Sequence, residues 1–487
     1  MQNNFQSLSY FLPEITIVLT ILFTIISDLV KDLKKYTHKF VMFGLGLTGV
    51  LLFLDSSTSV SKYLFNDMLI FDSVSFYFKC IILLSTFSII MVSKYSLELD
   101  DEYRSEYNTL LLVVLLGMFL MTNSVNLIMI YLSLELVSIP SYVLAGILKN
   151  DKKSNEASLK YVIFGSFASG LMLFGFSVLY GLSGTLNIYE IHTFLLNVNN
   201  PTAVLFAILL ILAGFGYKIS MVPFHYWTPD VYEGSPTTIT AFLSVAPKAA
   251  GFALMLRFFL NIFTNEGSFL SSSPLLGIDW PMLLAILSAL TMTVGNILAL
   301  RQDNVKRMLA YSTISHVGFM LMALCTLTPV ALTGIGFYLL VYSFMNLSSF
   351  YMVIYMSNNY NAQSIDDWRG IAFKSPVLSA FTVLNMVSLA GLPPTSGFIG
   401  KVYLFRGLFY DQEFYWLGII AVLNSVISLY YYFKIVKSMY FFEDNTKKYK
   451  KANPVVYWSI IVLSLQNLVF YLYWSDLYAY IEGVFSL

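Results

Sequence analysis

Four ionisable side chains stand inside long apolar segments of this sequence. Glu135 lies in NLIMIYLSLELVSIPSYVLAG, Lys218 in ILAGFGYKISMVPFHYW, Lys248 in AFLSVAPKAAGFALML and Lys401 in SGFIGKVYLF. A charged side chain at the centre of a bilayer costs at least about 2.5 to 3.5 kcal/mol on insertion scales, so it persists only with a partner, water or a function. Carboxylates and amines in such a setting point to proton transfer rather than to covalent chemistry.

Glu135 and Lys218 are predicted to form a switchable pair. A lysine deprived of water has a lowered pKa, and a nearby carboxylate raises it again, so movement of either partner can load or release a proton. We expect Lys248 to pass this proton on and Lys401 to serve a second half-channel. The alternative is that the lysines only stabilise the packing of the helices.

Three further residues are candidates for a relay. Lys160 follows a basic loop, where a lysine can equally well extend its ammonium group to the membrane surface. His225 could transfer protons with its near-neutral pKa, or it could hydrogen-bond the backbone of a broken helix. His316, in AYSTISHVGF, could link two half-channels, or it could be a histidine satisfied within the core.

Four other ionisable residues are interpreted as structural. Arg257 and Arg406 approach the ends of predicted helices, where anchoring at the membrane surface is the simpler account. His38 and His192 are placed in loops and need no functional explanation.

The composition shows what must position these side chains. Of 487 residues, 57% are hydrophobic and 11% are charged, against about 25% charged residues in an ordinary soluble domain. The mean hydropathy is +0.71. The formal net charge is +0 without long charged runs, which gives no indication of nucleic-acid binding. The segment MQNNFQSLSYFLPE has no positively charged start, so no cleaved targeting peptide is expected.

The apolar segments predict an all-α polytopic membrane protein with about fourteen transmembrane helices, each of roughly 20 residues. The predicted spans are residues 11–30, 40–54, 74–92, 107–121, 126–148, 158–182, 204–222, 237–262, 282–300, 308–327, 331–356, 377–410, 416–439 and 455–474. Lysine and arginine gather in alternate connections, which supports this count. These basic connections contain Lys31, Lys34, Lys35, Lys39, Lys149, Lys152, Lys153, Arg301, Lys306, Arg307, Arg369, Lys374, Lys447, Lys448, Lys450 and Lys451.

Two predicted helices are interrupted by proline. The seventh runs into Pro223, Pro229 and Pro236, and the twelfth contains GLPP at residues 391–394. Counted from helices 4 and 9, each break falls in the fourth member of a block of five. Because five is odd, the two blocks have opposite orientation, which is typical of an inverted repeat with broken helices beside a polar path. Simple proline kinks are the alternative.

The repeat divides the chain into four predicted parts. They are a three-helix segment over 1–106, a first antiporter-like repeat over 107–265, a second inverted repeat over 281–440, and a C-terminal loop and helix over 441–487.

Several kinds of active site are not indicated. Cys80 and Cys325 are far apart, whereas an iron–sulfur cluster needs about four thiolates at close spacing. No GxGxxG stands between a strand and a helix, and there is no phosphate-binding GKS or GKT motif. No group of potential ligands has the spacing of a metal site. We expect neither a redox cofactor nor a metal on this chain.

Three long motifs resemble one family. KISMVPFHYWTPDVYEGSPTTITAFLSVAPKAAGF (218–252), NVKRMLAYSTISHVGF (304–319) and SLAGLPPTSGFIGKVYLF (388–405) are similar to the antiporter-like N subunits of proton-pumping NADH:quinone oxidoreductase, respiratory complex I. Mitochondria call this component subunit 2. With YLSLELVSIPSYVLAG and NEASLKYVIFGSFASGLMLFG, the resemblance covers most of predicted helices 4 to 13. The segment PFHYWTPDVYEGSPT favours the N type over its larger siblings.

The resemblance implies a membrane-arm subunit whose two inverted half-channels translocate a proton, driven by quinone reduction elsewhere in the complex. NADH, FMN, iron–sulfur clusters and quinone would then belong to other subunits. Its partners would be neighbouring membrane-arm subunits and the lipid bilayer. The charged positions of the family are matched here by Glu135, Lys160, Lys218, His225, Lys248 and Lys401.

Two other functions are left open by the sequence. A subunit of a multisubunit cation/proton antiporter is built from the same repeat, and a structural spacer would use its lysines only for packing. The full length and phrases such as VAPKAAGFALMLRFF favour a bacterial inner membrane, with the mitochondrial inner membrane as the alternative.

Overall fold

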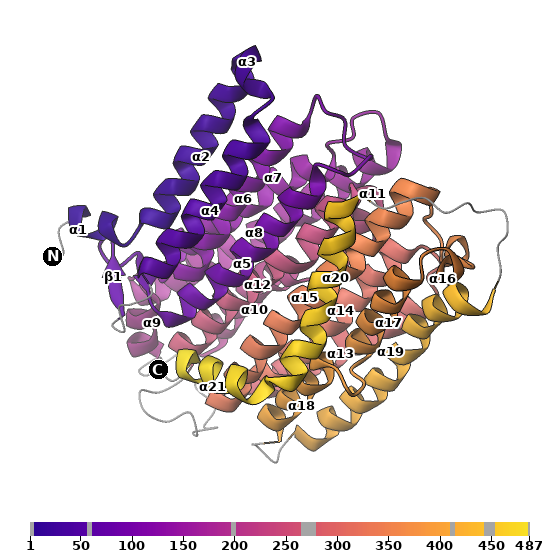
Figure 1. The fold of residues 1–487 in the computed structure, drawn as a ribbon. Helices are drawn as coiled ribbons and strands as arrows, with labels where there is room; N and C mark the ends of the chain where they lie inside the picture. Colours follow the sequence, from indigo (N-terminus) through magenta and orange to yellow (C-terminus); the bar gives the residue numbers. More distant parts are fainter. Residues whose placement is uncertain are drawn as a thin grey trace. The chain divides into compact units, whose positions relative to one another are not determined.

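The chain is almost entirely α-helical (Figure 1). The computed structural model describes residues 4–55, 61–195, 201–263, 279–409, 414–442 and 453–485. Within these residues, 12 helices are long and apolar enough to cross a membrane. The predicted all-α polytopic fold is confirmed, whereas the count of fourteen spans stays a prediction. Spans 308–327 and 377–410 are not among the 12. They correspond to α14 (Val305–Leu324) and to the pair α17 (Pro376–Ala390) and α18 (Ser396–Leu408).

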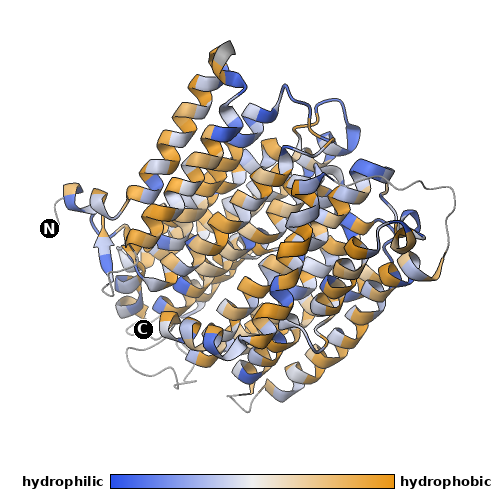
Figure 2. Ribbon diagram, viewed as in Figure 1, coloured by the Kyte–Doolittle hydropathy of each residue, from blue (hydrophilic) through white to orange (hydrophobic). Residues whose placement is uncertain are grey.

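Apolar side chains cover the outer faces of many helices. Figure 2 shows hydrophobic residues along the helices and hydrophilic residues gathered at their connections. Large apolar side chains such as Phe23, Phe43, Phe167 and Val426 are exposed. Exposed apolar surface of this extent needs lipid or partner proteins to cover it, which supports a multi-pass membrane protein.

The residues form two compact units. Unit 1 contains Met1–Lys94, Leu99–Ile219 and Ala246–Asp279, and unit 2 contains Tyr95–Glu98, Ser220–Val245 and Trp280–Leu487. The four-part division predicted from the sequence is not tested by this result and stays a prediction. One predicted basic connection lies outside the described residues at its lysines, which are Lys447, Lys448, Lys450 and Lys451.

Unit 1 is a bundle of helices with one short hairpin. Neighbouring pairs along the chain pack together, as α5 with α6, α6 with α7 and α7 with α8, and α10 packs on α8. The elements are α1 (Asn4–Ser9), α2 (Leu12–Leu29), α3 (Lys31–Lys34), α4 (Thr37–Asp55), β1 (Lys62–Leu64), β2 (Leu69–Phe71), α5 (Ser73–Ser93), α6 (Arg104–Asn123), α7 (Leu127–Ala145), α8 (Lys152–Ser183), α9 (Ile188–Leu195), α10 (Pro201–Ile219) and α12 (Thr237–Phe263) from Ala246 onward.

The hairpin and two helix starts follow from local sequence. The strands β1 and β2 pair antiparallel, with Tyr63 opposite Ile70. Asp72 and Ser75 form a reciprocal capping box at the start of α5, and the Asn126 side chain accepts hydrogen bonds from two amides at the start of α7. Such caps satisfy amide groups that have no partner within the helix.

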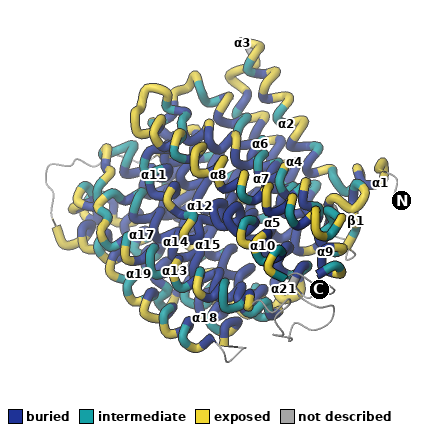
Figure 3. Tube along the Cα trace, turned by 180° about the vertical axis from the view of Figure 1, so that it is seen from behind, coloured by how far each residue is buried: buried dark blue, intermediate teal, exposed yellow. Residues whose placement is uncertain are grey.

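Unit 2 is centred on two helices that are buried along most of their length, α14 and α15 (Figure 3). The helix α15 packs against α14, α17, α18, α20 and α21. The elements are α11 (Trp227–Gly234), the first part of α12, α13 (Trp280–Leu300), α14 (Val305–Leu324), α15 (Pro329–Tyr360), the 3-10 helix η2 (Ile365–Trp368), α16 (Ile371–Lys374), α17 (Pro376–Ala390), α18 (Ser396–Leu408), α19 (Tyr415–Phe441), α20 (Pro454–Leu472) and α21 (Trp474–Phe485).

Both predicted helix breaks are present. The helix α10 ends at Ile219 and α11 begins at Trp227, while α17 ends at Ala390 and α18 begins at Ser396. At the second break, Gly391 has φ +80°, and the amides of Gly391 and Leu392 donate back to carbonyls of the last turn of α17. Glycine suits this left-handed cap because it has no Cβ to clash.

Candidate functional site

Lys218 lies in the last turn of α10, just before the first break, and its side chain is 2% exposed. Its Nζ donates a hydrogen bond of 3.1 Å to the Ser138 hydroxyl on α7. Ser138 in turn donates to the Leu134 carbonyl at 2.8 Å. The hydroxyl therefore presents an oxygen to the ammonium group of Lys218 without adding a charge.

Lys248 approaches the same place from α12. Its side chain is 1% exposed, and its Nζ lies 3.4 Å from the Lys218 carbonyl oxygen. One turn further along α12, a Cβ on Gly251 would lie 2.7 Å from Cγ2 of Ile219. The absence of a side chain at Gly251 therefore allows α12 to approach the end of α10 closely. Lys218 and Lys248 repel each other when both carry a proton.

Glu135 is the acidic neighbour of Lys218. It lies on α7 about one turn before Ser138, and its charge acts on Lys218. One carboxylate oxygen, Oε1, is buried and has no hydrogen-bond partner among the described residues. The structure thus brings three of the predicted residues together in unit 1, as Glu135, Lys218 and Lys248.

Lys401 lies at the second break, in unit 2. Its side chain is 4% exposed, and its Nζ donates to the Ala390 carbonyl at 2.8 Å and to the Ser425 hydroxyl at 3.0 Å. Ala390 is the last residue of α17, where carbonyls have no partner within the helix and the helix dipole is negative. Gly391 leaves room for the lysine, since a Cβ there would lie 2.6 Å from Cδ of Lys401.

His316, on α14, is held by two tyrosines. Its Nδ1 lies 2.7 Å from the Tyr338 hydroxyl, and its Nε2 lies 2.9 Å from the Tyr432 hydroxyl. The ammonium group of Lys401 stands 4.7 Å from the centre of the Phe319 ring, one turn from His316. The charge of Lys401 also acts on His316. The structure therefore brings these two predicted residues into one neighbourhood.

Hydroxyl and amide groups extend the surroundings of His316 within unit 2. The His316 ring lies against the Tyr342 ring, with 5.2 Å between their centres. The Tyr342 hydroxyl donates to Thr313 at 3.0 Å, and the Asn346 amide donates to the Tyr342 hydroxyl at 3.0 Å and to the Ser244 hydroxyl at 2.8 Å. These polar groups lie next to one another in the buried interior of unit 2.

The other two candidate relay residues have different surroundings. Lys160, on α8, forms an ion pair of 2.6 Å with Glu156 and keeps 36% of its side chain exposed. His225 lies in the segment between α10 and α11, is 4% exposed, and has an Nδ1 without a hydrogen-bond partner among the described residues. Lys160 thus has the setting of a residue near a surface, whereas His225 is buried with one nitrogen available.

Two buried ion pairs were missed by the sequence analysis. Lys79 on α5 binds Glu14 on α2 at 2.5 Å, and both side chains are at most 1% exposed. Both stand between apolar residues, in FLPEITIV and FYFKCIIL. The criterion that selected Glu135 would therefore also have selected them.

The second missed pair corrects one interpretation. Arg257 binds both carboxylate oxygens of Asp72, at 2.8 and 2.9 Å, and also donates to the Thr122 carbonyl at 3.0 Å. Arg257 is 6% exposed, so anchoring at the membrane surface is wrong for this residue. The placement of two histidines in loops is also wrong, because His38 lies in α4 and His192 in α9.

Comparison with known proteins identifies the family. The family described as "NADH:quinone oxidoreductase/Mrp antiporter, TM" matches residues 124–428, which is well over half of the chain. The chain belongs to this family. It is 43% identical to NADH-quinone oxidoreductase subunit N 2 of Chloroherpeton thalassium over 442 residues, covering 89% of this chain and 85% of that protein.

Solved structures agree with this assignment. A chain of respiratory complex I from Thermus thermophilus with bound aureothin is 27% identical, with a TM-score of 0.79, over 96% of this chain and 99% of that one. A chain of the Mrp complex from Dietzia sp. DQ12-45-1b has a TM-score of 0.85 at 19% identity, over 98% of this chain and 97% of that one. The second likeness concerns the fold alone.

Proposed function

We propose that this chain is a proton-translocating, antiporter-like subunit in the membrane arm of an NADH:quinone oxidoreductase. The observation that carries the proposal is a buried cluster in unit 1. Lys218 Nζ donates to the Ser138 hydroxyl, Lys248 Nζ lies 3.4 Å from the Lys218 backbone carbonyl oxygen, and the charge of Glu135 acts on Lys218. Groups that gain and lose protons are expensive to bury in a membrane. A cluster of them is therefore best explained by proton transfer.

Transfer through unit 1 follows from charge. With Glu135 ionised and near, the proton is favoured on Lys218, because opposite charges stabilise each other in a site with little water. When Glu135 is protonated or moves away, the protonated form of Lys218 loses the stabilisation that the carboxylate gives it. The proton can then pass to Lys248, whose ammonium group repels that of Lys218. Only one of the two lysines needs to be charged at a time.

Lys401 and His316 are proposed to act together in unit 2. The Ala390 carbonyl and the Ser425 hydroxyl stabilise a proton on Lys401. His316 can accept or donate through either ring nitrogen, because each faces a tyrosine hydroxyl that can do both. Lys160 and His225 are proposed as secondary relay residues.

The remaining assignments complete the proposal. Quinone reduction on other subunits supplies the driving force, and NADH, FMN, iron–sulfur clusters and quinone are bound there. Neighbouring antiporter-like subunits and lipid cover the exposed apolar helix faces. The membrane is the bacterial inner membrane, with the mitochondrial inner membrane as the alternative.

A subunit of a multisubunit cation/proton antiporter is the second candidate. The family description supports it, because this description names the Mrp antiporter together with NADH:quinone oxidoreductase. The likeness to a chain of an Mrp complex, at 19% identity, concerns the fold alone. The identity of 43% with a protein named as subunit N favours the first candidate.

The test is proton uptake driven by NADH in inverted membrane vesicles. Lys218→Ala is compared with the parent and with Lys152→Ala, which removes an exposed lysine from α8. Assembly and electron transfer are measured on the same samples. We expect Lys218→Ala to abolish uptake in an assembled complex while Lys152→Ala pumps normally.

Two results would overturn the proposal. Parental pumping by the assembled Lys218→Ala complex would make the lysine a packing residue and favour a spacer. Cation-dependent proton exchange without any NADH activity would favour the antiporter.

A further inference from the structure

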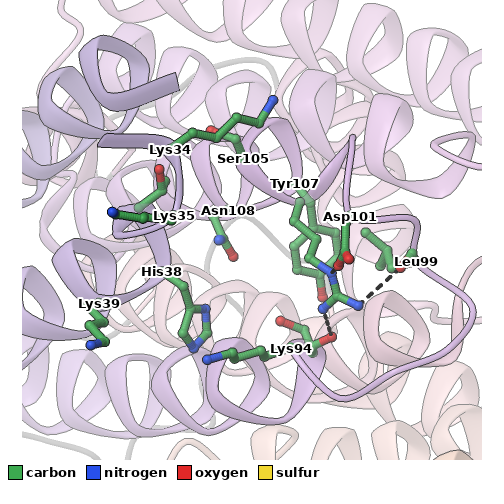
Figure 4. Close-up of a pocket in the computed structure, with 13 residues that line it drawn as sticks. Lys34, Lys35, His38, Lys39, Lys94, Leu99, Asp101, Ser105, Tyr107 and Asn108 are labelled. Carbon is green, nitrogen blue, oxygen red and sulfur yellow. Dashed lines mark hydrogen bonds and ion pairs between the residues drawn. The ribbon is translucent and has the colours of Figure 1, made fainter. Parts of the chain in front are cut away.

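A cavity of about 310 Å³ opens where several helices of unit 1 end. Its lining comes from the connection between α2 and α4, the end of α5 and the start of α6 (Figure 4). This volume is at the lower end of the roughly 300–1,000 Å³ typical of sites for small ligands. None of the residues proposed for proton transfer lines it.

Basic side chains dominate the lining. Four lysines and one arginine stand against a single aspartate, together with His38. The ammonium group of Lys94 lies beside the His38 ring (Figure 4), and the charge of Lys94 acts on that ring. The lysines in the lining are Lys34, Lys35, Lys39 and Lys94.

Two acidic groups here, Asp101 and Asp28, already have partners. Asp101 accepts a hydrogen bond from Arg104 at 2.5 Å, and Asp28 forms an ion pair with Lys34 at 3.1 Å. Arg104 also donates to the carbonyls of Ser93 and Leu99, which fixes it in the wall of the cavity. The excess positive charge of the lining therefore favours an anion.

Asn108 adds a neutral polar group to the lining. It is 4% exposed, and its Oδ1 is buried without a hydrogen-bond partner among the described residues. A buried acceptor of this kind is costly unless a donor satisfies it. A ligand with an anionic group for the lysines and a hydroxyl group for Asn108 fits both features.

The surroundings indicate a lipid rather than a soluble anion. Directly beyond Lys39, α4 exposes the apolar side chains of Phe40 and Phe43, and α2 exposes Ile26 and Leu29 near its end. Such faces contact acyl chains in a bilayer. The cavity thus lies at headgroup depth, where basic residues attract anionic lipids.

We infer that this cavity binds the headgroup of an anionic phospholipid that carries hydroxyl groups, of the phosphatidylglycerol type. The lysines hold the phosphate, and Asn108 accepts a hydrogen bond from a headgroup hydroxyl. The acyl chains follow the exposed faces of α2 and α4. The inference does not depend on the proton path.

The test uses the full chain in its purified complex, placed in phosphatidylcholine nanodiscs with a trace of photoactivatable phosphatidylglycerol. Lys39→Gln with Lys94→Gln is compared with Lys152→Gln and Lys153→Gln, which removes the same charge from exposed positions outside the lining. We expect crosslinks in peptides containing residues 34–39 and 93–108. The cavity variant should lower their yield about fivefold for each charge removed, and the control variant less than twofold.

Two further measurements identify the ligand. Unlabelled phosphatidylglycerol should compete with the probe, whereas millimolar inorganic phosphate should not. Asn108→Leu should weaken competition by phosphatidylglycerol about threefold but leave competition by phosphatidic acid, which has no headgroup hydroxyl, unchanged. Lys94→Arg, which keeps the charge, should bind like the parent.

Three outcomes would overturn the inference. Crosslinks spread evenly over the chain would contradict lipid binding in this cavity. Equal yields from the cavity and control variants would contradict it as well. Displacement by inorganic phosphate would show that the cavity takes a soluble anion instead of a lipid.

Discussion

Lys218 and Lys401 both lie beside a helix break, yet the two lysines are stabilised in different ways. Lys218 has the charge of Glu135 and a second lysine nearby. Lys401 has a backbone carbonyl, a hydroxyl and an aromatic ring. Among the described residues, no carboxylate forms an ion pair with Lys401. The Lys218 site therefore depends on neighbouring groups that can gain or lose a charge. The Lys401 site depends on neutral groups.

This difference suggests different roles in transfer. In the proposed path, Lys218 is the gating residue, because a carboxylate that can gain or lose a proton is near it. Lys401 is proposed to hold a proton until His316 or solvent accepts it, because the groups that bind its ammonium group are neutral. Adding or removing a changeable charge at each site tests this distinction.

The largest effect is expected from Glu135→Gln, which keeps the shape of the side chain but removes its charge. Proton uptake in vesicles should fall about 100-fold, the lower end of the contribution of a positioned proton-transfer group. Glu135→Asp should keep part of the activity because it retains the charge. Proton uptake at the parental rate by an assembled Glu135→Gln complex would show that Lys218 does not depend on the charge of Glu135.

The reverse change makes the second site resemble the first. Ser425→Asp places a carboxylate next to Lys401, where a charged hydrogen bond of roughly 1.5 kcal/mol should retain the proton and slow uptake about tenfold. Ser425→Asn is the neutral control and should pump within about twofold of the parent. If both variants pump equally, a fixed charge at Lys401 is not what limits transfer.

A smaller effect is expected from Gly391→Ala. The left-handed backbone at φ +80° disfavours alanine by about 1–2 kcal/mol, and its Cβ would also crowd the Lys401 side chain. Gly184→Ala is the matched control, since Gly184 has φ +71° with open space around it. Thermal unfolding should show the same backbone effect in both variants, but only Gly391→Ala should slow uptake, by about fivefold.

The smallest effect is expected from Tyr432→Phe, which removes one of the two hydroxyls at His316. A neutral hydrogen bond contributes about 1 kcal/mol, and Tyr338 still holds the other ring nitrogen, so uptake should fall only about twofold. Tyr430→Phe, at an exposed position of α19, should change nothing. A complete loss of uptake in Tyr432→Phe would show that His316 transfers protons through that hydroxyl alone.

Apolar segments and proline placement were enough to predict the helical fold and both breaks. The isolated charges at Glu135, Lys218, Lys248 and Lys401 were visible because apolar residues surround each of them. Their partners were harder to predict, because Ser138 and Ser425 look like any other helical serine. The Ala390 carbonyl could not be predicted from residue type, because it belongs to the backbone.

Pairing between residues far apart in the sequence was the main feature that could not be predicted. Arg257 and Asp72 are 185 positions apart, and each alone resembles a residue at the end of a helix. Only the packing of α12 against the start of α5 turns them into a buried ion pair. The cavity near Lys39 likewise needs two regions of the chain, residues 34–39 and 93–108, to meet, which no local pattern predicts.

The way Lys401 is held also affects how this region can vary. Its nearest acceptor belongs to the backbone of residue 390, and every amino acid has the same carbonyl group. A substitution at position 390 changes the side chain and leaves that acceptor in place. The Lys401 site therefore tolerates substitution of residue 390, whose carbonyl binds the lysine. It is sensitive to changes that let α17 continue, such as loss of Gly391 or of the prolines that follow it.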